Sequence, residues 1–90
     1  MDYKQKTIIT LKKAKSLNSK VIEMLESDKY CIDIIQQNLA IIGLLKSANL
    51  SLLEGHLGCC VTDAAIAKDK KRLGEMMNEI LKVVKTAQNK

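Results

Sequence analysis

The fold is decided by residues 32–57, which read IDIIQQNLAIIGLLKSANLSLLEGHL. This stretch contains no proline and no alternation of apolar and polar residues, so it predicts a helix rather than a strand. A helix that is apolar around most of its circumference is buried on several sides. Because a 90-residue chain offers only two other helices to cover it, we expect a partner chain to complete the burial. The apolar residues are Ile32, Ile34, Ile35, Leu39, Ile41, Ile42, Leu44, Leu45, Leu50, Leu52, Leu53 and Leu57.

The rest of the chain predicts two further helices, so the fold class is all-α: a three-helix protomer in a single domain over residues 1–90. The predicted helices cover about residues 4–26, 29–64 and 68–87. We expect Ser27 or Asp28 to be the N-cap of the long central helix. The first helix has an apolar stripe of Ile8, Leu11, Ala14, Leu17, Val21, Met24 and Leu25, and the third has one of Leu73, Met76, Met77, Ile80, Leu81, Val84 and Ala87.

Positive charge is concentrated at the two ends of the chain. Residues 1–27 carry a net charge of +3, residues 28–67 one of −2 and residues 68–90 one of +4, giving +5 in all. These lysines are either solvated helix faces or a surface for a polyanion. With two Tyr and no Phe or Trp, the chain lacks the aromatic platforms that bind single strands, whereas duplex DNA needs only positive charge. The candidate DNA contacts are Lys12, Lys13, Lys15 and Lys20.

Three features predict a cytoplasmic protein that is not an enzyme. The first ten residues, MDYKQKTIIT, are charged and lack the apolar core of a secretory signal, and no stretch of the sequence approaches the roughly 20 apolar residues of a membrane span. Three cysteines are an odd number, which does not indicate a disulfide framework, and in the cytosol thiols stay reduced. One histidine, no glycine-rich phosphate loop and no Cys-x-x-Cys pair argue against hydrolytic or redox catalysis.

A candidate metal site is centred on residues 55–61, GHLGCCV, which contain the only histidine. His56 and Cys60 are four residues apart, so a helix places both on one face. Cys31 lies 29 positions before Cys60, about 43 Å away along a continuous helix. Two such helices, antiparallel about a two-fold axis, bring Cys31 of one chain beside the other two donors of the second chain. The predicted site is therefore shared between two chains and occurs twice in a dimer.

A competing geometry has a sharp break near Gly43 or Asn49 that folds Cys31 back within one chain. Helical periodicity persists through both positions, which favours the continuous helix. Two sulfurs and one imidazole suit trigonal Cu(I), whereas zinc needs a fourth ligand from Cys59 or water. Cys59 lies about 100° around the helix from Cys60, so we interpret it as packing or a spare thiol. Taken singly, each cysteine is a small buried hydrophobe and the histidine a half-exposed polar residue.

Residues 27–64, SDKYCIDIIQQNLAIIGLLKSANLSLLEGHLGCCVTDA, resemble the central helix of the copper-sensitive operon repressor family, the CsoR-like metal-sensing repressors. The segments DKYCIDI and LLEGHLGCCV, with the spacing of Cys31, His56 and Cys60, match that family's Cys–His–Cys copper signature. Nickel- and cobalt-sensing relatives use more histidines, one of them near the N-terminus, where this sequence has none.

The resemblance implies an antiparallel dimer, usually paired into a tetramer, with a Cu(I) site built across two chains. It implies repression without metal and release of operator DNA when copper binds. It also implies that Tyr30 and Glu75 form an outer shell that links the metal to DNA affinity. Such outer groups orient the ligands and transmit a binding event.

The sequence departs from the family pattern at its expected DNA surface. The family's first helix commonly reads Arg-Arg-x-Glu-Gly-Gln, whereas this chain has KKAKSL at residues 12–17. Ile42 stands where an arginine is often found, and Arg72 is the only arginine in the chain. Lysine contacts phosphate but bonds guanine edges less well than arginine. Two alternatives therefore stay open: a copper-binding protein with lost or altered DNA binding, and a thiol or persulfide sensor that links Cys31 and Cys60 of different chains.

Overall fold

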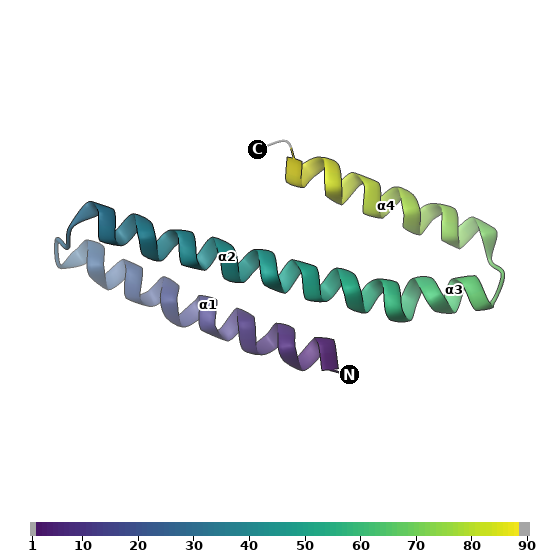
Figure 1. Ribbon diagram of the computed structural model, residues 1–90, viewed down its shortest axis with the longest axis horizontal. Helices are drawn as coiled ribbons and strands as arrows, with labels where there is room; N and C mark the ends of the chain where they lie inside the picture. Colours follow the sequence, from purple (N-terminus) through teal and green to yellow (C-terminus); the bar gives the residue numbers. More distant parts are fainter. Residues whose placement is uncertain (1, 89–90) are drawn as a thin grey trace. The chain divides into compact units, whose positions relative to one another are not determined.

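The computed structural model describes residues 2–88, and within them it shows helices and short turns but no strand, which confirms the all-α prediction (Figure 1). No helix in this range is long and apolar enough to cross a membrane. Residues 2–88 form three helical segments, because helical conformation continues without interruption from α2 through η1 and α3. The elements are α1 (Asp2–Glu26), α2 (Cys31–His56), the π-helical turn η1 (Leu57–Val61), α3 (Thr62–Ile66) and α4 (Lys70–Gln88).

The chain divides into two compact units, with the boundary between Gly55 and His56. The first unit is the hairpin of α1 and α2 up to Gly55. The second contains η1, α3 and α4, and in it α3 packs against both neighbours in sequence. Of the apolar stripe predicted for the third helix, Met76 is buried, Leu73 and Ile80 are half-buried, and the rest is exposed.

In the first unit, α1 and α2 run antiparallel along a seam that repeats every seven residues (Figure 1). Seven-residue spacing is the signature of side chains that interlock between two helices. Most buried side chains of this seam are small, which brings the two backbones close together. The seam consists of Thr7, Ala14 and Val21 on α1 and of Ile34, Ile41, Ala48 and Gly55 on α2, of which Ile41 is half-buried and the others are buried.

The seam on α1 differs from the stripe predicted by hydropathy. Leu11 and Leu25 are 43% and 60% exposed, whereas Thr7 is buried. The Thr7 hydroxyl donates a hydrogen bond to the carbonyl of Tyr3 at 2.6 Å, so the helix itself satisfies this polar group. A buried hydroxyl that is hydrogen-bonded carries no large burial cost. The sequence prediction ranked residues by hydrophobicity and therefore missed Thr7.

The turn between α1 and α2 is a Schellman motif in which Asp28 adopts the left-handed conformation, with φ of 55°. The N–H groups of Asp28 and Lys29 donate to the carbonyls of Leu25 and Met24 at 3.2 and 2.9 Å. This pair of bonds satisfies carbonyls that a helix end leaves free. The prediction that Ser27 or Asp28 caps the start of the next helix is wrong, because both residues terminate α1.

The turn before α4 repeats this motif with Lys68 in the left-handed position, at φ of 56°. The N–H groups of Lys68 and Asp69 donate to the carbonyls of Ala65 and Ala64, both at 3.1 Å. Asp69 has a second role, because its carboxylate accepts the N–H of Arg72 at 3.0 Å and so forms an N-cap. The third helical segment therefore begins directly after Asp69, two residues later than predicted.

Replacing Lys68 by glycine is expected to stabilise the protein. A residue with a Cβ pays about 1 kcal/mol to adopt the left-handed conformation, whereas glycine does not. Urea denaturation should therefore give a higher midpoint for Lys68→Gly than for the parent chain. Lys68→Ala is the control, because it removes the same charge but keeps the Cβ; an equal gain in both variants would assign the effect to charge.

Candidate metal centre

Two of the predicted donors lie at opposite ends of α2, Cys31 as its first residue and His56 as its last. The helix runs through Gly43 and Asn49 without interruption, so the alternative of a sharp break at either residue is wrong. The two donors are 25 residues apart, which is about seven helical turns and about 38 Å, so they lie on one side of the helix and far apart. One α2 helix therefore cannot offer both to a single ion.

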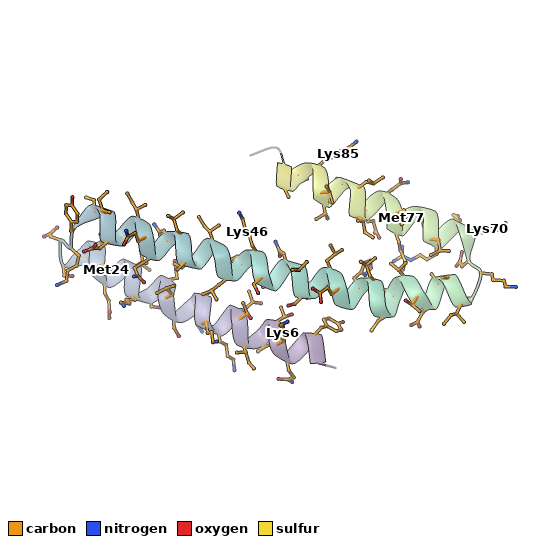
Figure 2. The ribbon with its side chains drawn as sticks, in the orientation of Figure 1. Lys6, Met24, Lys46, Lys70, Met77 and Lys85 are labelled. Carbon is orange, nitrogen blue, oxygen red and sulfur yellow. The ribbon has the colours of Figure 1, made fainter. Side chains whose placement is uncertain are left out.

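The side of α2 that joins these two donors is exposed and rich in large apolar residues. Ile35, Leu39 and Ile42, at helical spacing from Cys31, are 51%, 60% and 46% exposed. Three exposed polar residues, Asn38, Lys46 and Asn49, interrupt this row. Lys46 projects from the side of α2 that faces away from α1 (Figure 2). The donors thus stand at the two ends of one exposed apolar surface, which the hairpin seam does not cover.

The remaining two cysteines lie in the π-helical turn η1, where Cys60 is exposed and Cys59 half-buried. We expected a regular α-helix through these residues; the structure has wider turns, which close between residues five apart. The Thr62 hydroxyl donates to the carbonyl of Leu57 at 2.8 Å, across five residues. Single π-turns are frequent at functional sites, and this one contains two of the three thiols.

The donor set itself fits a soft metal ion. Cys31, Cys59 and Cys60 are all free thiols, and two of them are exposed. Thiolate and imidazole ligands together suit Cu(I) and zinc, whereas carboxylate-rich sites suit harder ions. Across the side chains that the structure describes in one chain, no three His, Cys, Asp or Glu residues converge on a common point. The role of the Cys31, His56 and Cys60 set stays a prediction.

Tyr30 and Glu75, predicted to surround the metal, lie in different units. Tyr30 is 70% exposed, and its carbonyl accepts the N–H of Ile34 at 3.3 Å, where α2 begins. Glu75 lies 3.8 Å from the guanidinium of Arg72, one turn earlier on α4, in an exposed ion pair. An exposed pair of this kind contributes little to stability. The outer-shell role of Tyr30 and Glu75 stays a prediction.

The four candidate DNA contacts are lysines of α1. Lys12, Lys13, Lys15 and Lys20 are all exposed, and none lies in the hairpin seam. Residues 3–22 contain no Asp or Glu, so no carboxylate of this part of α1 lies near these lysines in sequence. Exposed lysines free of neighbouring acids are suited to contact phosphates. The structure therefore leaves these side chains available for the role predicted for them.

Sequence reasoning missed a close contact beside His56. At Gly55 an added Cβ would overlap the ring of Tyr3, so the two helices can approach here only because residue 55 is glycine. Tyr3, Lys6, Ser51 and Glu54 line a hollow of about 260 Å³ at this end of the hairpin. An isolated glycine inside a helical pattern was the available signal, since it often marks a close approach.

The fold, the Cys and His side chains and the lysines of α1 together define a class: an all-α protein with a candidate soft-metal donor set and a lysine-rich helix. Residues 3–86 match the family model of the metal-sensitive transcriptional repressors. The chain belongs to this family of metal-sensing transcriptional repressors, which confirms the resemblance noted in the sequence. The family is one of repressors rather than enzymes, as the sequence predicted.

Three curated relatives are named as copper-sensing transcriptional repressors. RicR of Mycobacterium tuberculosis (strain ATCC 25618 / H37Rv) is 48% identical over 44 residues, 49% of this chain and 46% of the relative. CsoR of Mycobacterium ulcerans (strain Agy99) is 37% identical over 65 residues, 72% of this chain and 56% of the relative. CsoR of Bacillus subtilis (strain 168) is 34% identical over 86 residues, 92% of this chain and 85% of the relative. The chain thus spans about half the length of the first two relatives. No solved structure gives a significant match.

Proposed function

We propose that this protein is a cytoplasmic Cu(I)-responsive repressor that binds duplex operator DNA without metal and releases it when Cu(I) binds. One observation carries the proposal. Cys31 and His56 mark the two ends of a single exposed apolar side of α2, in a chain that belongs to a family of metal-sensing repressors. That the three relatives described above are named copper sensors supports Cu(I) as the metal.

The unit that completes the site is a homodimer with antiparallel α2 helices. A two-fold axis midway along α2 places Cys31 of one protomer opposite His56 of its partner. Covering this side would remove from water large apolar groups that a single chain leaves exposed, which is the main driving force for association. The same axis sets exposed apolar residues opposite one another, Ile35 with Leu52 and Ile42 with Leu45. Two such dimers would pair into a tetramer, as the family resemblance implies.

Each metal site would take Cys31 from one protomer and His56 and Cys60 from the other. Cu(I), when bound, supplies a soft centre that joins two sulfurs and one nitrogen. Both thiols bind as thiolates, so binding releases protons and is favoured by rising pH. Tyr30, next to Cys31, and Glu75 on α4 would respond to this cross-link and pass it to the DNA-binding surface.

The experiment that tests this function measures DNA affinity with and without copper. A fluorescent duplex from the protein's own promoter region is bound by the metal-free chain, and Cu(I) is then added without oxygen. We expect the parent chain to release the DNA. The His56→Ala variant, measured in parallel, should stay bound to the duplex. Unchanged affinity on saturation with Cu(I) would contradict the proposal.

Two other results would favour the alternative functions, one in this experiment and one when a persulfide replaces Cu(I). Copper binding without any duplex binding would indicate a protein that has lost its operator contacts, which the missing arginines and Ile42 would explain. Full release from His56→Ala on treatment with a persulfide would indicate a thiol sensor using Cys31 and Cys60, because disulfide chemistry does not need the imidazole.

Replacing Lys12 and Lys13 by glutamine is expected to weaken binding to all duplexes alike. Each lost phosphate contact should lower the slope of log affinity against log salt by about 1. Binding isotherms at several salt concentrations measure both effects. The control is Lys82→Gln with Lys85→Gln on α4, which changes net charge equally; the same loss there would show that only total charge matters (Figure 2 labels Lys85).

A further inference from the structure

The hydroxyl of Thr62 makes a bond that differs from those of the other threonines. Thr7, Thr10 and Thr86 each donate to the carbonyl four residues earlier, at 2.6, 3.0 and 2.9 Å, as expected in an α-helix. Thr62 donates instead to the carbonyl five residues earlier, that of Leu57, at 2.8 Å. This bond joins the first residue of η1 to the residue that follows its last, whereas the N–H of Thr62 donates to the carbonyl of Cys59. Thr62 is therefore a side-chain brace for η1.

The π-turn separates two thiols that an α-helix would present almost equally. In an α-helix, Cys59 and Cys60 would lie about 60° and about 40° to either side of the direction of His56. A π-turn closes on the fifth residue, so each residue rotates by less than about 90°. Cys60 then stays near the direction of His56, whereas Cys59 turns at least about 90° away.

The two thiols also differ in how far solvent reaches them. Cys60 is exposed, and Cys59 is half-buried. Thr62 itself is exposed, so its hydroxyl could bond to water at little cost if the brace were removed. The bond to Leu57 thus serves the shape of the turn rather than the rescue of a buried polar group.

We propose that Thr62 is a positioning residue that holds the π-turn and thereby selects Cys60, not Cys59, as the thiol that acts with His56. The choice of metal-binding thiol rests on the proposed copper function. The accessibility of the two thiols does not, because it is a property of the metal-free chain.

The first test measures thiol reactivity in the metal-free full-length protein. Iodoacetamide at limiting concentration modifies the folded chain, and mass spectrometry of peptides gives the rates at Cys59 and Cys60, with Cys31 as internal standard. In the parent chain Cys60 should react faster. In Thr62→Val, which keeps the shape but removes the donor, the ratio of the two rates should move toward unity by about threefold or more. Thr86→Val, which removes an ordinary bond on α4, should leave the ratio unchanged.

The second test measures Cu(I) affinity against a chromophoric chelator. In the parent chain, Cys60→Ser should lower the affinity about 100-fold or more, and Cys59→Ser less than about twofold. In the Thr62→Val background the two serine variants should become similar, within about tenfold of each other. Thr62→Ser keeps a hydroxyl donor and should restore the parent pattern.

The outcomes separate the two proposals. If Cu(I) does not bind the parent chain, the copper function fails, and the alkylation ratio alone still decides the role of Thr62. If Thr62→Val keeps the parent ratio and the parent ranking, the positioning role is wrong. If Thr62→Val does not fold, as judged by its circular dichroism, Thr62→Ser is compared with the parent chain instead. A changed ratio of the Cys59 and Cys60 alkylation rates in Thr62→Ser would then overturn the proposal.

Discussion

Mixing a Cys31→Ser chain with a Cys60→Ser chain is expected to restore Cu(I) binding that neither variant has alone. In the proposed dimer, each site takes Cys31 from one protomer and His56 with Cys60 from the other. A mixed dimer therefore has one site that lacks both thiols and one site that is intact. Each variant alone forms dimers in which both sites lack a thiolate, and a single imidazole with one thiolate binds Cu(I) far more weakly.

The measurement is Cu(I) stoichiometry after the two variants have been unfolded together and refolded. Random pairing makes half of the dimers mixed, and each mixed dimer should bind one ion tightly. Mixing Cys31→Ser with His56→Ala is a second pair that should complement in the same way. Two copies of Cys60→Ser carrying different mass tags provide the control, since they exchange but should not bind. Failure of both pairs to complement would contradict a site shared between two chains.

Replacing Gly55 by alanine is expected to destabilise the protein, although alanine is the better helix former. The new Cβ would overlap the ring of Tyr3, so the ring or the whole of α1 has to move. Overpacking of this kind costs about 1–3 kcal/mol, against a helix-propensity gain of about 1 kcal/mol. A net loss of up to about 2 kcal/mol should appear as a lower denaturation midpoint.

The matched control is Gly74→Ala on α4, where an added Cβ meets nothing within 4 Å. This variant should gain about 1 kcal/mol from helix propensity alone. Gly55→Ala placed in a Tyr3→Ala background should gain by a similar amount, because the obstructing ring is gone. A stabilising Gly55→Ala in the parent chain would show that the Tyr3 ring does not pack against this glycine.

The class of the fold could be predicted from the sequence because its signals are redundant. The chain has no proline, its central stretch is apolar around most of the helix circumference, and no segment alternates apolar and polar residues, so all these signals favour helices. The contact seam was less predictable. Leu11 and Leu25 satisfy hydropathy as well as Val21 does, whereas Thr7 becomes an interior residue only because its hydroxyl bonds to its own helix. A hydrophobicity scale favours large apolar side chains, whereas the residues buried in the seam are those small enough to let the two backbones approach.

The turns before α2 and α4 show why an aspartate at a helix boundary does not always cap the next helix. Asp28 and Asp69 are the same residue type at the same kind of boundary. Asp69 caps α4 because that helix begins at the next residue, whereas α2 begins three residues after Asp28. Residue preference identifies a boundary, but only the length of the turn decides whether an aspartate ends one helix or starts the next.

For the candidate metal centre, spacing predicted that Cys31 and His56 lie far apart on one continuous helix. Cys31 and His56 stand at those ends in the structure, as a continuous helix requires. The π-turn could not be predicted, because residues 57–61 have no composition that distinguishes them from an α-helix. Its physical signal is the reach of the Thr62 hydroxyl, which exists only once the backbone has widened.

Because of the exposed apolar side of α2, the lifetime of this protein should depend on its own concentration. In the proposed dimer, a chain buries that side only against its twin, so its folded fraction rises with the number of copies present. A few scattered copies would stay largely unpaired and open to proteolysis, and a larger pool would protect itself. The repressor would then accumulate only above a threshold concentration. That threshold would be set by the affinity of one helix face for its copy, without an additional regulator.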